Sequence, residues 1–415
     1  DGTTYNVVAR GLLRNAEFDI ASGHYGQPEI HAFYLSASRT IHGVPVDGPG
    51  SRAVISVGSR GLVHSFAGAW KIGTLTDKVA TPLEKPRVEE LIRGQLKAVA
   101  AEGDASITDV KLVYYDGNGE LLQPAYRYAA VVRQHPQDIN PRVNEAYLVG
   151  YVPFAGLSEK LPTLQPTLAQ TEQSRPLGRG NGGLSVGTYV ARDDHPGWRS
   201  DAQEFVKSLS TSVAGPKFTS VEALDAEPDH FVAKKDTFVN ARRIALVEAH
   251  GSWWHFATER DSEDIVPLGA IDGYGRLANG NLASWVIHSC EVIPGADDTT
   301  AWAGRWVKVF KGLSHVVGYR STMFINDGAG ATYGASLGRL APVVGSWLTD
   351  VTSLNAYANR TYSVTRDCDP SVMGWPSAIS LCDREDDTVL GTPPETAPRC
   401  LRAWWVSDAN QKTAS

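Results

Sequence analysis

The chain has 415 residues, enough for two domains with well-developed cores, and its 42% hydrophobic and 20% charged content indicates a globular protein rather than a disordered or fibrous one. A formal charge of -7 with scattered Lys and Arg argues against a nucleic-acid partner and a polybasic membrane anchor, and no apolar run approaches the roughly 18 residues of a membrane span. Because the chain begins with Asp1 rather than Met, we expect that a signal peptide or longer leader has been removed.

Residues 1–156 predict a small α+β domain. Their apolar periodicity indicates one helix followed by three antiparallel strands, over residues 91–101, 110–115, 126–132 and 146–152. Leu122, Pro124 and Tyr126 lie just after the first hairpin turn, a pattern that resembles PepSY or thermolysin-propeptide domains. This resemblance implies a chaperone, inhibitor or substrate-guiding module that packs on the rest of the protein.

A change of composition separates this unit from the remainder of the chain. Residues 157–183 lose hydrophobic periodicity and are rich in Pro, Thr, Gln and Gly, which predicts a linker, with a long surface loop inside one domain as the alternative. Residues 184–415 then alternate strands and helices. The strands are expected at 184–190, 244–249, 285–289 and 315–319, and the helices at 198–213 and 301–311. This order predicts a mostly parallel sheet flanked by helices.

Two of these strands end in chemically capable residues. The run 244–249 leads directly into His250 and Gly251, and the run 285–289 leads into Cys290. In an open α/β sheet, ligands bind beyond the carboxyl ends of the strands, so a thiol and an imidazole delivered to one edge can meet over a substrate carbonyl.

The His-Gly and Ser-Cys motifs, in this order and at strand ends, resemble the caspase, legumain and gingipain group of cysteine peptidases, over roughly residues 184–360. The match implies a caspase-like domain at 184–415 that cuts peptides or proteins, or transfers peptides, without a cofactor. Cys290 would be the nucleophile and His250 the base and proton donor. The N–H groups of Gly251 and Cys290 would form the oxyanion hole. Glu248 faces the same side as His250, so it would orient the imidazole or lie in solvent at the strand end.

Other interpretations of these residues stay open. Cys290 would be a small buried hydrophobe if the chain only binds a peptide or glycan. A zinc site would need His250, His255, His288 and Cys290, but their spacing lacks a metal motif, and we expect no metal. Trp253 and Trp254 would wall a substrate cleft or form a hydrophobic lid. His288 and His315 are expected to pack against neighbouring helices.

The remaining cysteines crowd near the C-terminus. Any two of Cys368, Cys382 and Cys400 can form a bridge, and the short loop between Cys368 and Cys382 favours that pair. Together with the start at Asp1, this crowding predicts a secreted, extracellular protein.

Overall fold

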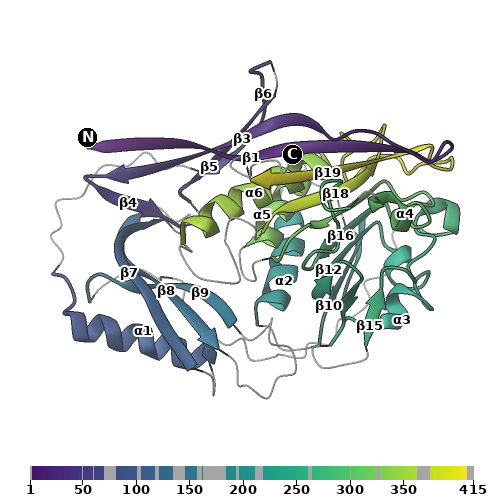
Figure 1. The fold of residues 1–415 in the computed structure, drawn as a ribbon. Helices are drawn as coiled ribbons and strands as arrows, with labels where there is room; N and C mark the ends of the chain where they lie inside the picture. Colours follow the sequence, from purple (N-terminus) through teal and green to yellow (C-terminus); the bar gives the residue numbers. More distant parts are fainter. Residues whose placement is uncertain are drawn as a thin grey trace.

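The fold was analysed in a computed structural model, which describes residues 2–48, 50–58, 60–69, 81–100, 104–116, 121–133, 145–156, 161, 184–192, 196–210, 218–259, 264–299, 301–323, 328–361 and 374–408. A mixed sheet runs through the whole molecule, with helices on both of its faces (Figure 1). The predicted linker, except for Leu161, lies outside the described residues.

The parallel half of the sheet comes from the second half of the chain. Its strands, in spatial order, are β11 (Phe218–Asp225), β10 (Leu184–Val190), β12 (Ile244–Glu248), β16 (Ser284–His288) and β17 (His315–Tyr319). Strands β12, β16 and β17 are buried at every position, as strands covered on both faces must be, which explains their continuous apolar runs. The predicted parallel sheet is confirmed for this region.

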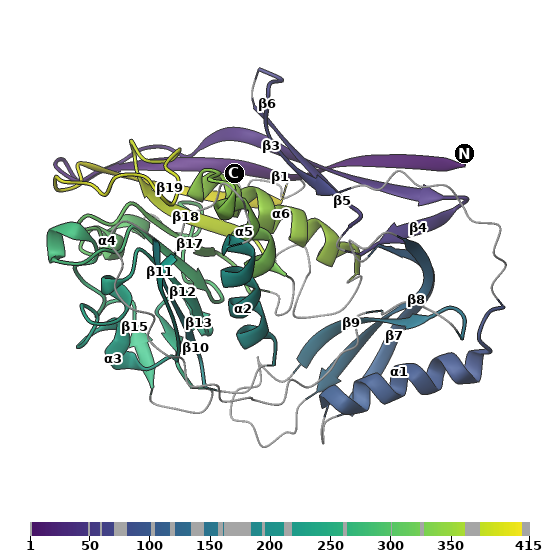
Figure 2. The same cartoon turned by 180° about the vertical axis from the view of Figure 1, so that it is seen from behind.

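The antiparallel half joins the two ends of the chain. Strand β17 pairs with β18 (Pro376–Leu381), followed by β19 (Cys400–Asp408), β1 (Thr3–Asp19) and β3 (Glu29–Ile41). In the register, Gly11 of β1 lies opposite Asp408 and Asp19 lies opposite Cys400. Figures 1 and 2 show β1 and β3 extending along the length of the molecule. Residues 1–156 therefore do not form a separate sheet, because their first strands complete the sheet of the C-terminal part.

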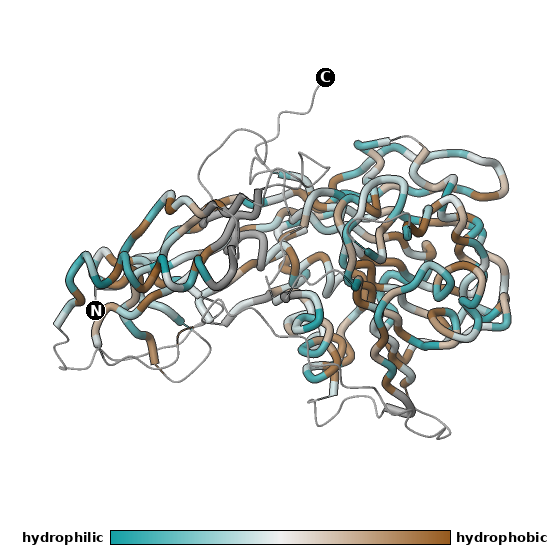
Figure 3. Tube along the Cα trace, turned by 90° about the horizontal axis from the view of Figure 1, so that it is seen from below, coloured by the Kyte–Doolittle hydropathy of each residue, from teal (hydrophilic) through white to brown (hydrophobic). Residues whose placement is uncertain are grey.

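Short strands lead from this sheet to a second unit. Strand β2 (His24–Tyr25) pairs with β1, β5 (Arg52–Gly58) pairs with β3, and β6 (Val63–Ala69) pairs with β5. Strand β4 (Val44–Asp47) pairs with the meander of β7 (Asp104–Asp116), β8 (Leu122–Arg133) and β9 (Glu145–Pro153). Helix α1 (Lys85–Ala100) packs on this meander through Val88, Ile92 and Leu96. Figure 3 shows hydrophilic and hydrophobic residues alternating along this helix. The expected helix and three-stranded meander are thus present.

Three helices cover one face of the main sheet, namely α2 (Pro196–Ser210), α5 (Ala329–Gly338) and α6 (Val343–Thr361). Helix α2 buries the predicted stripe that begins with Trp198. It approaches α5 closely at Gly330, Gly334 and Gly338, where an added Cβ would meet backbone oxygens of α2 at 2.4 to 2.9 Å. Side chains larger than hydrogen at these positions would push the two helices apart.

The opposite face carries shorter elements. They are α3 (Pro228–Phe231), α4 (Trp302–Trp306), the 3-10 turns Val239–Ala241 and Arg276–Ala278, and a small sheet of β13 (His250–Ser252), β14 (His255–Ala257) and β15 (Ile265–Pro267). Helix α4 is shorter than the expected 301–311. Tyr274 exchanges backbone hydrogen bonds with Val309 and Lys311, so the chain leaves the helix to form this bridge. Within the described residues, no helix is long and apolar enough to cross a membrane.

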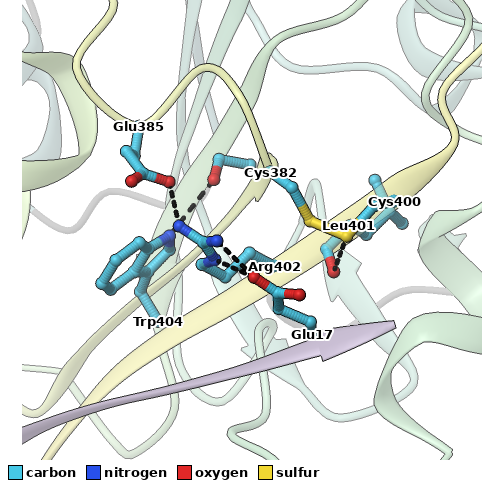
Figure 4. Close-up of a disulfide and its surroundings, with 8 residues drawn as sticks. Glu17, Cys382, Glu385, Cys400, Leu401, Arg402 and Trp404 are labelled. Atoms are coloured by element: carbon cyan, nitrogen blue, oxygen red, sulfur yellow. Dashed lines mark hydrogen bonds and ion pairs between the residues drawn. A yellow bond between two sulfur atoms is a disulfide. The ribbon is translucent and has the colours of Figure 1, made fainter. Parts of the chain in front are cut away.

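The C-terminal bridge joins Cys382 to Cys400 (Figure 4). The favoured pairing of Cys368 with Cys382 was therefore wrong. The pairing of β18 with β19 brings Cys382 next to Cys400, and the separation of cysteines in the sequence does not show this. Cys368 lies outside the described residues. Beside the bridge, Arg402 bonds with Glu17 and Glu385, which ties β19 to β1 and to the loop between β18 and β19.

Candidate functional site

The histidine and cysteine singled out in the sequence follow neighbouring parallel strands. Strands β12 and β16 pair directly, with Glu248 opposite His288. His250 and Cys290 each come two residues after this last matched pair, so both leave the sheet at its carboxyl edge. The prediction that the two strands lie side by side is confirmed.

Gly251 brings the two segments into contact. A Cβ added at Gly251 would lie 2.0 Å from Ser289 Oγ and 2.7 Å from the carbonyl oxygen of Cys290. Such distances leave no room for any side chain, and glycine is the residue that permits this approach. The backbone that carries the imidazole therefore touches the backbone that carries the thiol.

The Cys290 thiol is half-buried, and its sulfur atom accepts a hydrogen bond from the Met323 N–H at 3.4 Å. Burial raises the pKa of Cys290, and the nearby Glu291 carboxylate adds to this effect, whereas the Met323 N–H and His288 oppose it. The thiol is thus protonated near neutral pH and needs a base to become a nucleophile. Glu291 adopts a left-handed conformation with φ of 57°, which turns the chain sharply after Cys290.

His250 is held from the side by helix α2. Its ring lies 4.6 Å from the ring of Trp198, with the two planes nearly perpendicular. Trp198 is 1% exposed and is the first residue of the buried stripe of α2, so the core holds the tryptophan ring in place beside His250. The sequence predicted the helix and its apolar face, but it contained no signal that this face meets His250.

Beneath these residues lies a fully buried polar group of Asp201, Glu248 and His288, called here the acidic–imidazole cluster. His288 Nδ1 lies 2.8 Å from Glu248 Oε1 and 3.3 Å from Asp201 Oδ2, and its Nε2 lies 3.2 Å from the Tyr319 hydroxyl. Glu248 therefore bonds with His288, a partner that the sequence did not indicate, and its orientation of His250 stays a prediction.

Electrostatics within the cluster favour bound protons. Burial raises the pKa of Glu248 well above its ordinary value; His288 opposes this effect and Asp201 adds to it. Burial alone would lower the pKa of His288, but the Glu248 and Asp201 carboxyls outweigh it and raise that pKa well above its usual value. His288 thus carries a positive charge next to the two acids. His288 also lies against Trp347 of α6, consistent with the expected packing against a helix.

The two tryptophans form the tip of the hairpin between β13 and β14. Trp253 is half-buried, whereas Trp254 is 67% exposed, with the Arg305 guanidinium 4.1 Å above its ring. Arg305 also donates a hydrogen bond to the carbonyl of Trp253. This pairing holds the tip against α4 and keeps one aromatic face in contact with a cation.

Potential metal ligands gather at two places among the described residues. Two groups of at least three His, Cys, Asp or Glu side chains have ligand atoms within 4.8 Å of one another, namely Glu17 with Cys382 and Cys400, and the acidic–imidazole cluster. Cys382 and Cys400 are joined in the disulfide, so the first group offers no thiolate ligand. The zinc alternative is not among these groups. His288 is engaged with two carboxyls, and His255 Nδ1 lies 3.2 Å from Ser252 Oγ.

Comparison with known proteins gives similarity without a function. Residues 185–368, which include both His250 and Cys290, match the model of a family described as a domain of unknown function (DUF6345). No curated protein matches the chain. Among solved structures, the chain is similar to an uncharacterized protein from Eubacterium rectale ATCC 33656, with 14% identity over 36% of this chain and a TM-score of 0.23. The match spans 50% of that protein's length.

Proposed function

We propose that this chain is a secreted cysteine peptidase or transpeptidase in which Cys290 is the nucleophile and His250 the base. The observation that supports this most strongly is the contact of Gly251 with Cys290 across the carboxyl edge of β12 and β16. An imidazole and a thiol that leave adjacent strands at one edge have the mutual placement that acyl transfer requires.

The chemistry follows from the protonated state of the thiol. His250 takes the proton from Cys290 Sγ while the sulfur attacks the carbonyl carbon of the peptide bond. The N–H groups of Gly251 and Cys290 are proposed to bind the oxyanion that forms. His250 then gives the proton to the leaving amine as the C–N bond breaks, leaving a thioester on Cys290. Water hydrolyses this thioester, or a second amine accepts the acyl group.

The fold determines which protein the test must use. Because β1 pairs with β19, a fragment of residues 184–415 would expose the edge of β19 that β1 covers. Full-length chain is therefore incubated with a mixed peptide library, as wild type, Cys290→Ala and His250→Ala. His255→Ala is the matched control, since His255 is a half-buried imidazole on the neighbouring strand β14.

Both Cys290→Ala and His250→Ala are expected to reduce cleavage by roughly 10²-fold or more, the usual effect of losing a nucleophile or a general base. The double variant is expected to be scarcely worse than either single variant, because the two residues act as one unit. His255→Ala should stay within about twofold of wild type. Undiminished cleavage by Cys290→Ala would end the cysteine-peptidase proposal.

A second candidate function is binding of a peptide or glycan without catalysis. It is favoured by Trp254, whose exposed ring under Arg305 offers a flat aromatic surface beside the carboxyl edge. In this case Trp254→Ala would weaken binding to a peptide or glycan array, and Cys290→Ala would leave binding unchanged. If both Trp254→Ala and Cys290→Ala still bound the array as wild type does, this result would argue against the Trp254 surface as the binding site.

A further inference from the structure

The acidic–imidazole cluster has a fixed relation to the proposed catalytic pair. Glu248, the last residue of β12, precedes His250 by two residues, and His288, the last residue of β16, precedes Cys290 by two residues. Glu248 and His288 lie opposite each other as the last matched pair of the two strands. Each proposed catalytic residue therefore follows, two residues later, one member of a buried, hydrogen-bonded pair.

Helix α2 connects the third member of the cluster to His250. Asp201 lies 3.3 Å from His288 Nδ1, and Trp198, three residues earlier on the same helix face, contacts the His250 ring. Both oxygens of Asp201 also accept the Gly330 N–H, at 2.9 and 3.1 Å, at the start of α5. The position of Trp198 against His250 thus depends on where Asp201 is held.

A separate connection runs from the cluster to the thiol. The Tyr319 hydroxyl lies 3.2 Å from His288 Nε2, at the end of β17. The chain that follows β17 presents the Met323 N–H to Cys290 Sγ. Bonds from one buried imidazole therefore tie β12, β16, β17 and α2 together under both reacting groups.

We infer that Asp201, Glu248 and His288 are positioning residues for the catalytic pair: they lock the register of β12 against β16 and, through Trp198, orient the imidazole of His250. This inference rests on the proposed function of Cys290 and His250. None of the three touches a substrate in this role, since all are buried.

The charges of the cluster explain why its members act together. Although burial opposes the shift, the Glu248 and Asp201 carboxyls raise the pKa of His288 well above its usual value, so His288 carries a positive charge beside them. This positive charge offsets negative charge on the two carboxyls. Replacing one member changes this balance in a buried site, where polar groups that lose a partner are costly. The groups that face His288 are Asp201 from α2, Glu248 from β12, Tyr319 from β17 and Trp347 from α6.

The test uses full-length variants that change the cluster while preserving side-chain shape. Asp201→Asn and Glu248→Gln replace a carboxyl group with a neutral amide of similar shape, and Tyr319→Phe removes only the hydroxyl that bonds with His288. His315→Asn is the matched control, because His315 is an equally buried imidazole that bonds with the Arg384 carbonyl at the amino end of β17. Urea unfolding, kcat and KM for one library peptide, and the rate of Cys290 alkylation by iodoacetamide against pH are measured for each.

We expect kcat to fall about tenfold or more in Asp201→Asn and Glu248→Gln, and severalfold in the milder Tyr319→Phe, with KM within about twofold of wild type, because misplacement slows the chemical step. The pH profile of alkylation should shift in the same variants. His315→Asn should lose stability but keep kcat and the alkylation profile. Cluster variants that behave like His315→Asn would overturn the inference.

The alkylation series separates this inference from the proposed function. If wild-type chain cleaves no peptide but the cluster variants still shift the alkylation profile of Cys290, the peptidase proposal fails and the positioning role stands. If neither the profile nor cleavage differs between the cluster variants and His315→Asn, the positioning role fails, even where wild type cleaves peptides.

Discussion

Substituting Gly251 with alanine tests the contact on which the candidate site depends. The added Cβ would lie 2.0 Å from Ser289 Oγ, 2.7 Å from the Cys290 carbonyl oxygen and 3.0 Å from Val292 Cγ1. The Ser289 hydroxyl can rotate away, but the carbonyl belongs to the backbone and cannot. Gly251→Ala must therefore move the His250 segment away from the Cys290 segment.

The size of the effect follows from ordinary contact distances. Relieving the carbonyl contact needs a separation of several tenths of an ångström, and overpacking of this kind typically costs about 1–3 kcal/mol of unfolding free energy. Catalysis is more sensitive, because a displacement of about 1 Å can cost roughly 10²-fold in rate. We expect a modest loss of stability and a larger loss of peptide cleavage.

Two measurements check this expectation on full-length chain. Urea unfolding, followed by the fluorescence of the 11 tryptophans, gives the free energy of unfolding, and peptide cleavage gives kcat. The matched control is Gly269→Ala, since among the described residues nothing lies within 4 Å of the Cβ it would add. If Gly251→Ala behaved like Gly269→Ala in both measurements, the close contact between Gly251 and the Cys290 segment would be refuted.

A double variant tells which atom causes the clash. Ser289 Oγ is buried and has no hydrogen-bond partner among the described residues, so Ser289→Ala alone should be neutral or slightly stabilising. Adding Ser289→Ala to Gly251→Ala should recover stability in part, because the Cys290 carbonyl still obstructs the new methyl group. Full recovery would mean that the backbone contact is looser than the structure indicates.

Three further outcomes follow from burial and charge. Because burial raises the pKa of Cys290, its alkylation should accelerate with a midpoint above the ordinary thiol value of about 8.5, and a midpoint below neutral pH would contradict this. The pKa values of Glu248 and His288 are raised in the folded chain, so the folded chain binds more protons than the unfolded chain. The unfolding free energy measured in urea should therefore fall as the pH rises above about 6.5, the pKa of histidine in the unfolded chain. A rise of the unfolding free energy in this pH range would oppose this assignment. Reducing the bridge between Cys382 and Cys400, 18 residues apart, should lower the free energy of thermal unfolding by about 3 kcal/mol. Labelling of Cys290 should stay unchanged, because the bridge lies at the amino edge of the sheet and Cys290 lies at its carboxyl edge.

The sequence predicts β10, β12, β16 and β17 well because they are buried almost throughout. Runs such as 244–248 and 315–319 have no polar alternation, and their lengths match the observed strands closely. The edge strand β11, which is half-buried or exposed over residues 221–225, was not predicted. The antiparallel strands at the start of the chain were not predicted. Strand β1 is exposed along most of its first half, so apolar residues do not mark it, and periodicity indicates a face rather than a neighbour. Its pairing with β19 is a contact between the two ends of the chain.

For the candidate site, strand periodicity indicated which side a residue faces, but the sequence did not indicate which residues bond with one another. Periodicity placed Glu248 on the same side as His250; in the structure Glu248 lies near Asp201 and His250 contacts Trp198, both residues of helix α2. The bond between Glu248 and His288 depends on the register of two strands 40 residues apart, which no local pattern contains. Asp201 is missed for a related reason, since an acid inside an amphipathic helix is usually exposed.

The position of the acidic–imidazole cluster argues for a role beyond stability. A buried group of charges is often less stable than apolar residues of similar volume, because burial removes the charges from water. Strands β12 and β16 are apolar along most of their length and become ionisable only at their final matched pair, Glu248 and His288. Stability alone would favour apolar residues there as well. The polar pair instead occupies the position at which hydrogen bonds, which are directional where apolar contacts are not, most directly determine how His250 and Cys290 leave the sheet.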